Sequence, residues 1–138
     1  MADKNEMGAV ILRVVLGVVF LAHGLDKIQG GVGNTAAWFD SIGLPGFLAY
    51  AVVLIETAGG IALILGLATR IVAGLLAVVL AGAIITVQLS AGFLGGYAYD
   101  LALLAMAVYL FINGSKLYSA DQLLFSGKKE SETAVGTM

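Results

Sequence analysis

The sequence predicts an all-α protein, an integral membrane bundle of four helices, and its composition and hydropathy pattern lead to that prediction. Of the 138 residues, 60% are hydrophobic and only 12% are charged, whereas charged residues make up about a quarter of a soluble domain. Four apolar stretches are separated by polar segments and lie at residues 8–25, 47–67, 71–91 and 99–113. About 20 apolar residues in a helix cross the hydrocarbon core of a bilayer. We therefore expect one multi-pass domain in the cell membrane.

The first apolar stretch, residues 8–25, has the length and apolar character of a signal peptide as well as of a membrane helix. Arg13 lies within it, and Asp26 and Lys27 follow it without a small-residue cleavage pattern. We therefore interpret this stretch as the first membrane helix, preceded by a short cytoplasmic N-terminus at residues 1–7.

Glycine, proline and segment length predict the conformation of the segments between the helices. Residues 26–45 form a long loop, in which we expect a short surface helix with Thr35 as its N-cap. Pro45, the only proline, suits the start of the second membrane helix. Residues 68–70 predict a tight turn, and the glycine-containing residues 93–97 predict another.

The third stretch carries a face of small residues. Ala73, Ala77 and Ala81 recur every four residues, with Gly74 and Gly82 beside them. Small residues let the backbones of membrane helices approach closely. The same face could be used within one chain or in a homodimer, and membrane lipid would cover whatever remains outside the bundle.

Basic residues predict the orientation of the bundle. With the N-terminus inside, Lys27 is alone on the outer side, and the inner side holds Lys4, Arg70, Lys116, Lys128 and Lys129. Cytoplasmic segments carry an excess of lysine and arginine, which predicts the N-in/C-in arrangement with the long loop outside. Residues 8–124 then form the transmembrane domain, and the polar residues 125–138 form a cytoplasmic tail that we expect to be disordered.

Glu56, near the middle of the second stretch, is the polar residue that most needs an explanation. A carboxylate at that depth is costly unless it faces the bundle interior, finds a partner or is protonated. It could pair with Arg13 and fix the register of two helices, or it could belong to a site that binds a substrate, and the sequence leaves both alternatives open.

Four further polar residues lie near the outer ends of the helices. His23 could bond to a backbone carbonyl or to Asp26, or it could transfer protons, as histidine side chains commonly do. Lys27 and Asp100 could mark the membrane boundary or bind a substrate. Gln88 could join two helices by a hydrogen bond or orient a ligand. Trp38 and Tyr99 are interpreted mainly as interfacial aromatic residues.

Several kinds of chemistry are excluded by what the sequence lacks. The chain has no cysteine, which excludes a disulfide and a thiol redox pair, and it has one histidine and no cluster with metal-ligand spacing. We predict no metal site and no intrinsic cofactor. The formal net charge is only −2, and no basic patch suggests nucleic acid. Any redox role would need a bound organic molecule, such as a quinone, or a redox partner protein.

Four segments resemble the DoxX family of small four-helix bacterial membrane proteins. These segments are LRVVLGVVFLAHGLDKI at 12–28, LIETAGGIALILGLATR at 54–70, GGYAYDLALLAMAVYLFING at 95–114 and YSADQLL at 118–124. The resemblance covers residues 8–124. By position it identifies as family-like the polar residues Arg13, His23, Lys27, Glu56, Arg70 and Asp121.

The resemblance implies a membrane oxidoreductase, with some relatives linked to quinones or to the response to catechols. On this basis we expect a subunit that handles a quinone or catechol-like ring. His23 and Glu56 would exchange protons with the ring oxygens, Arg13 and Lys27 would hold its anionic form, and Gln88 would orient it. The alternatives are a non-catalytic scaffold or assembly factor for a redox enzyme and, third, a small-molecule transporter.

Overall fold

The computed structural model describes residues 4–124, and every regular element among them is helical. The predicted disordered tail lies outside the described residues. The principal helices are α1 (Lys4–Gln29), α2 (Val32–Ser41), α3 (Phe47–Leu65), α4 (Thr69–Ala83) and α5 (Ala98–Asn113). By length and composition, 4 segments could cross a membrane, namely Lys4–Gln29, Phe47–Leu65, Thr69–Ala91 and Phe93–Asn113. The predicted all-α bundle with four membrane helices is confirmed.

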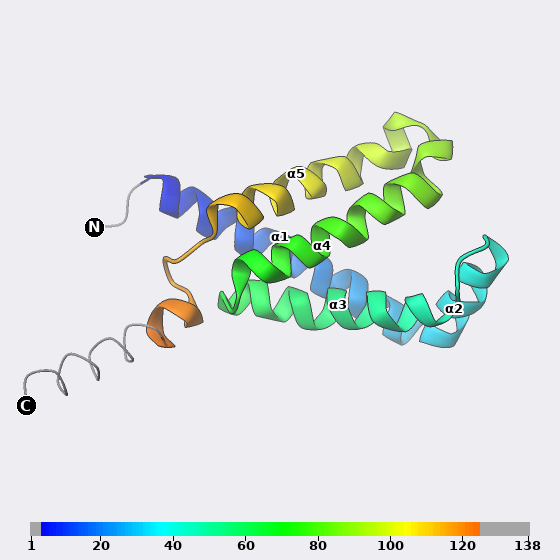
Figure 1. The fold of residues 1–138 in the computed structure, drawn as a ribbon, viewed down its shortest axis with the longest axis horizontal. Helices are drawn as coiled ribbons and strands as arrows, with labels where there is room; N and C mark the ends of the chain where they lie inside the picture. The colour runs from blue at the N-terminus through cyan, green and yellow to red at the C-terminus, as the bar shows by residue number, and fades with distance from the viewer. Residues whose placement is uncertain (1–3, 125–138) are drawn as a thin grey trace, which may run out of the picture.

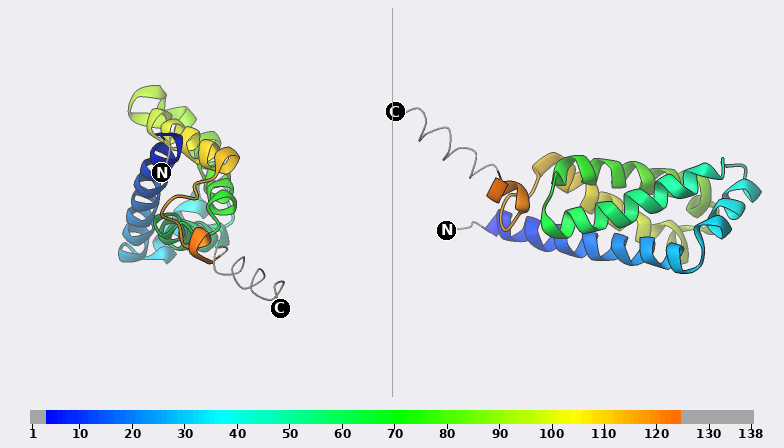
Figure 2. Two further views of the ribbon diagram at one scale, coloured as in Figure 1. Left: turned by 90° about the vertical axis from the view of Figure 1, so that its left-hand side faces the viewer. Right: turned by 90° about the horizontal axis from the view of Figure 1, so that it is seen from below.

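The bundle consists of two helix pairs that spread apart toward one end (Figure 1). α1 packs along α3 and α4 packs along α5, while the contacts between α3 and α4 are fewer. α1 begins and α5 ends at the same end of the bundle, which we call the terminal end (Figures 1 and 2). The opposite end carries α2, and we call it the loop end. The basic residues predict that the terminal end faces the cytoplasm.

Glycine allows α1 and α3 to pack closely. A Cβ atom added to Gly60 would lie 2.6 Å from the backbone nitrogen of Leu21, and one added to Gly17 would lie 2.8 Å from the carbonyl oxygen of Gly60. Neither position has room for a side chain, so the two backbones are in direct contact. This contact fixes the axial register of the two helices, which matters for the polar residues they carry.

The helix ends differ slightly from the predicted ones. α3 ends at Leu65 because Gly66 adopts a left-handed conformation with φ 75° and closes the helix, and α4 begins at Thr69. α2 begins at Val32, with Gly31 (φ 90°) before it and no side-chain cap. The expectation that Thr35 caps this helix is therefore wrong, because Thr35 already lies within the first turn.

The third membrane segment is not α-helical to its end. After α4 the chain forms a π-helical turn, η1 (Ile84–Gln88), and a 3₁₀ turn, η2 (Leu89–Ala91). The Thr86 hydroxyl donates to the carbonyl oxygen of Gly82 at 2.7 Å, and such side-chain bonds to the preceding turn often bend helices. The next segment, η3 (Phe93–Tyr97), has non-helical dihedral angles at its centre and makes the predicted turn.

The hydrophobic core lies toward the terminal end. Its fully buried side chains include Leu16, Leu63, Leu76 and Leu110, one from each membrane segment. Leu63 and Leu110 lie within the last turns of α3 and α5, so the bundle is filled by leucine at this end. The loop end is organised differently, because it contains the larger cavity.

Candidate functional site

A cavity of about 560 Å³ lies between the helix pairs near the loop end. Side chains from α1, α3, α4, η1 and α5 form its walls, and Trp38 and Phe39 of α2 also line it. The walls are mainly apolar, and include Phe20, Leu48, Val52, Ile55, Val79 and Leu103. A largely apolar cavity of this size with a few polar groups has the usual properties of a small-molecule site.

Five of the six predicted site residues line this cavity. His23 and Lys27 come from α1, Glu56 from α3, Gln88 from η1 and Asp100 from the first turn of α5. These residues are far apart in the sequence, and the fold brings them to one cavity. The sixth predicted residue, Arg13, does not line it.

Glu56 forms an ion pair with Lys27. The Lys27 ammonium donates to Glu56 Oε2 at 2.7 Å, and the side chains are 27% and 7% exposed, respectively. The alternative in which Glu56 pairs with Arg13 is therefore wrong. The reason is the register set by glycine: a Cβ atom on Gly24 would lie 2.9 Å from the backbone nitrogen of Thr57, so Glu56 lies beside Gly24, one turn from Lys27.

Arg13 instead holds the chain segment that follows α5. Its Nη1 atom donates to the Ser115 hydroxyl at 3.1 Å and to the Leu117 carbonyl at 3.0 Å, and Nη2 donates to the Tyr118 carbonyl at 2.8 Å. Arg13 and Gly24 are 11 positions apart, which corresponds to about 16 Å along a helix and places the guanidinium far from Glu56. The expectation that Arg13 binds the substrate of this cavity is not supported by its position.

Two other family-like residues also form hydrogen bonds at the terminal end. Arg70 Nε donates to the carbonyl oxygen of Phe111 at 2.9 Å, at the end of α5. Asp121 Oδ2 accepts a hydrogen bond from the backbone N–H of Ala68 at 2.7 Å. The six polar residues identified by the resemblance thus divide into a cavity group (His23, Lys27, Glu56) and a terminal-end group (Arg13, Arg70, Asp121).

His23 is held in a defined orientation. Its Nδ1 atom lies 2.8 Å from the carbonyl oxygen of Val19, and since a carbonyl only accepts, Nδ1 carries the proton of this bond. In the neutral ring Nε2 is then the unprotonated nitrogen. The ring stacks on Tyr99, with centroids 6.1 Å apart and planes inclined by 23°. The bond to a backbone carbonyl was one of the predicted alternatives.

Asp100 and Gln88 complete the polar part of the cavity. Asp100 lies within electrostatic range of both His23 and Lys27. Gln88 is the last residue of η1, where the π-helical turn changes the direction of the side chains relative to a continuous α-helix. π-helical turns of this kind occur frequently at functional sites.

Two aromatic residues that the sequence predicts to be mainly interfacial lie in the cavity wall. Trp38 and Tyr99 both line the cavity, and both are about half exposed. Tyr99 directly precedes Asp100, but no sequence signal places it against His23, because α1 and α5 are distant in the chain.

Among residues 4–124 no group of three or more histidine or acidic residues could hold a metal ion.

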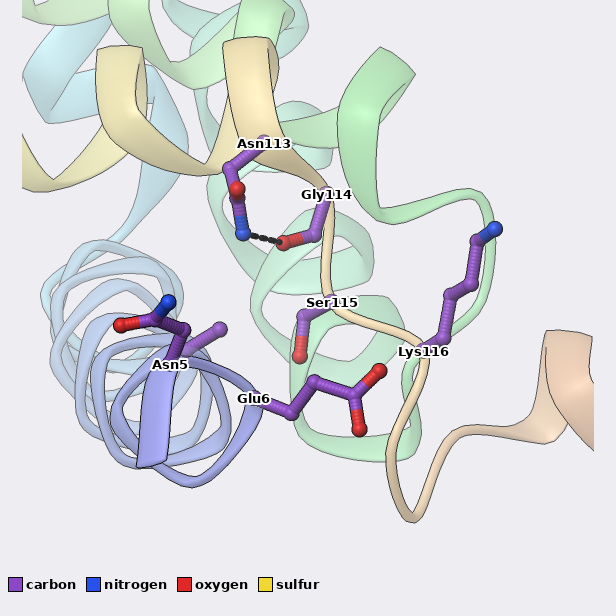
Figure 3. A pocket seen from close by; sticks show the side chains of 7 residues that line it. Asn5, Glu6, Asn113, Gly114, Ser115 and Lys116 are labelled. Carbon is purple, nitrogen blue, oxygen red and sulfur yellow. Dashed lines mark hydrogen bonds between the residues drawn. The ribbon is translucent and has the colours of Figure 1, made fainter. Parts of the chain in front are cut away.

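A smaller cavity of about 300 Å³ lies at the terminal end, between the start of α1 and the end of α5 (Figure 3). Its polar side chains include Asn5, Glu6 and Lys116, and Asn113 donates to the carbonyl oxygen of Gly114 at 3.1 Å. Glu6 extends from α1 toward the segment that carries Ser115 and Lys116 (Figure 3). None of the predicted site residues lines this cavity, so the cavity at the loop end is the candidate site.

Comparisons with known proteins agree with this architecture. The chain is 46% identical over 134 residues to "Putative oxidoreductase CatD" of Bacillus subtilis (strain 168), covering 97% of this chain and 99% of that protein. It is 33% identical over 70 residues to the inner membrane protein YqjF of Escherichia coli (strain K12), covering 51% and 53% of the two chains. A third relative is the membrane protein Rv3486 of Mycobacterium tuberculosis (strain ATCC 25618 / H37Rv), at 32% identity over 140 residues with 88% and 83% covered.

No solved structure matches the chain. The family model described as DoxX matches residues 8–89, which is more than half of the chain and includes the cavity residues of α1, α3 and η1. Together with the four apolar helices, this match makes the protein a multi-pass cell membrane protein. The chain belongs to the DoxX family.

Proposed function

We propose that this protein is a membrane oxidoreductase subunit that binds a quinone or catechol-like ring in the cavity at the loop end. The observation that carries the proposal is that His23, Lys27, Glu56, Gln88 and Asp100, from separate segments, line one mainly apolar cavity. Its volume of about 560 Å³ is within the range of roughly 300–1,000 Å³ that small-molecule sites occupy. The relative in Bacillus subtilis named as an oxidoreductase supports the class of activity.

The polar residues suit the proton transfers that accompany ring oxidation and reduction. A quinone takes up two electrons and two protons when it becomes a quinol, and the reverse reaction releases them. The unprotonated Nε2 of His23 can accept a proton from a ring hydroxyl, and the Glu56 carboxylate can accept a second one while it stays bonded to Lys27 through Oε2. Gln88 offers both a donor and an acceptor for orienting the ring. We assign the electron transfer to a redox partner protein, because the chain has no cysteine pair.

A scaffold or assembly factor is the second candidate, and one observation favours it. Lys27 and Glu56 already satisfy each other at 2.7 Å, as a purely structural pair would. In that case the cavity would be a packing defect between the helix pairs, and the function would reside in a protein partner.

Ring binding to the purified protein separates the two candidates. Catechol and a short-chain quinone are titrated into protein in nanodiscs, with empty nanodiscs subtracted, for the natural chain, Glu56→Gln and His23→Ala. We expect saturable binding that weakens at least about tenfold in Glu56→Gln, as loss of a hydrogen bond to a charged group predicts, and several-fold in His23→Ala, as loss of a bond to a neutral group predicts. Asp26→Asn is the matched control, since Asp26 is an exposed carboxylate of α1 outside the cavity. Absence of saturable binding, together with a protein partner that co-purifies, would favour the scaffold.

A further inference from the structure

The cavity at the loop end is lined by more acidic than basic side chains. Its lining contains one lysine, Lys27, and two carboxylates, Glu56 and Asp100. Lys27 is already bonded to Glu56, and Arg13, the other cation expected to serve a ligand, is bonded to carbonyl groups at the terminal end. The Asp100 side chain makes no hydrogen bond or ion pair among residues 4–124, although it lies within electrostatic range of His23 and Lys27.

We infer that the cavity selects uncharged rings against rings that carry an anionic group, and that Asp100 is the residue that determines this selection. The inference rests on the proposed function, because it concerns the same ring-binding site. With His23 neutral, Lys27, Glu56 and Asp100 give the cavity a net charge of −1, and an anionic ring would enter without a free cation to pair with. The role first expected for Arg13 and Lys27, holding an anionic ring, is replaced by selection for a neutral one.

The chemistry of ring redox conversion is compatible with this selection. A quinone and its quinol are both uncharged, because two protons accompany two electrons. A site that keeps its only lysine paired and leaves Asp100 unpaired therefore suits both ends of the reaction. Like charges in a partly apolar cavity repel more strongly than in water, since the effective dielectric constant is lower.

Two rings of the same size and different charge test the inference. 3,4-Dihydroxybenzamide is neutral at pH 7.5, and 3,4-dihydroxybenzoate is its anionic counterpart. Equilibrium dialysis against protein in nanodiscs gives the two dissociation constants, with empty nanodiscs subtracted. We expect the amide to bind at least about tenfold more tightly, which is the order of effect that one like charge has at an effective dielectric constant near 20.

Three variants test whether Asp100 causes the preference for the neutral ring. Asp100→Asn removes the unpaired charge while keeping the side-chain shape, and it should reduce the ratio of the two dissociation constants to within about threefold. Glu56→Gln should weaken the binding of both rings, but because it releases Lys27 it should also reduce the ratio of the two dissociation constants. Asp26→Asn, on α1 outside the cavity, should leave the ratio unchanged.

The possible results are distinct. Equal or tighter binding of 3,4-dihydroxybenzoate, or an unchanged ratio in Asp100→Asn, would overturn the charge selection while leaving ring binding in place. Failure of both rings and of catechol to bind would overturn the proposed function and this inference together.

Discussion

At the scale of single residues, the ion pair of Lys27 and Glu56 joins α1 to α3 at the cavity in which we propose that a ring binds. Glu56 is 6% exposed, so its carboxylate depends on Lys27 for compensation of its charge. A buried pair adds little net stability, because desolvation offsets much of the attraction, but removing one partner is strongly unfavourable. Removal of Lys27 would therefore leave the Glu56 carboxylate buried without a compensating charge.

A double-mutant cycle measures this coupling. We expect Lys27→Met to lower the free energy of unfolding by about 3 kcal/mol, because Glu56 is left buried without a cation. Lys27→Met combined with Glu56→Gln should recover more than half of that loss, since no charge remains unpaired. Reversible unfolding in mixed detergent micelles gives the values. Additive losses in the double variant would show that the two side chains do not depend on each other.

At the scale of helices, the close contact of α1 and α3 determines which polar groups meet. Gly17, Gly24 and Gly60 bring the two backbones together along much of their length. This contact places Glu56 beside Gly24 and within reach of Lys27. The arrangement of the site is therefore a consequence of backbone packing between two neighbouring helices.

Substituting alanine for these glycines tests the packing. Gly60→Ala introduces a Cβ atom 2.6 Å from a backbone nitrogen of α1, which cannot move without separating the helices. We expect it to lower the melting temperature in detergent and to cost about 1–3 kcal/mol, as overpacking does. Gly8→Ala is the matched control on α1, since no atom lies within 4 Å of the added Cβ. Alanine favours helix over glycine, so this control should be neutral or stabilising; equal losses in both variants would contradict the packing argument.

The same helices show what the sequence could and could not predict. Hydropathy alone identifies the membrane segments, because their length and apolar content are properties of each stretch. The ends of α2 and α3 shifted by a few residues because Gly31 and Gly66 set them through backbone conformation. The π-helical turn that ends at Gln88 has no clear hydrophobic signal. The partner of Glu56 depends on the axial register of α1 and α3, which periodicity within one helix does not contain.

The sequence also predicted only part of the candidate site, because residue type is visible in the sequence and the grouping of residues in space is not. Lys27, Glu56 and Asp100 stand out because charged groups are rare in membrane segments, so their type alone indicated a role. Arg13 stood out equally, yet it holds the segment after α5. Residue type identified the polar groups, whereas only the fold separates the cavity group from the terminal-end group.

At the scale of the whole molecule, the two ends of the bundle differ in packing. The terminal end is closed by the leucine core and by the bonds from Arg13, and the loop end contains the cavity. A continuous polar path through the bundle would have to pass this core, which argues against the transporter alternative. We therefore expect polar solutes to reach the cavity from the side of the loop end.

Cysteine labelling tests this sidedness, and the natural chain provides a background without cysteine. Val52→Cys lines the cavity, Ala107→Cys lies in the fully buried core, and Lys116→Cys lies at the terminal end. A charged, membrane-impermeant methanethiosulfonate reagent is added to either side of oriented proteoliposomes. We expect Val52→Cys to react only from the loop-end side, Lys116→Cys only from the opposite side, and Ala107→Cys from neither. Reaction of Val52→Cys from the side that labels Lys116→Cys would show that the leucine core does not close the cavity, and protons for ring chemistry could then come from either compartment.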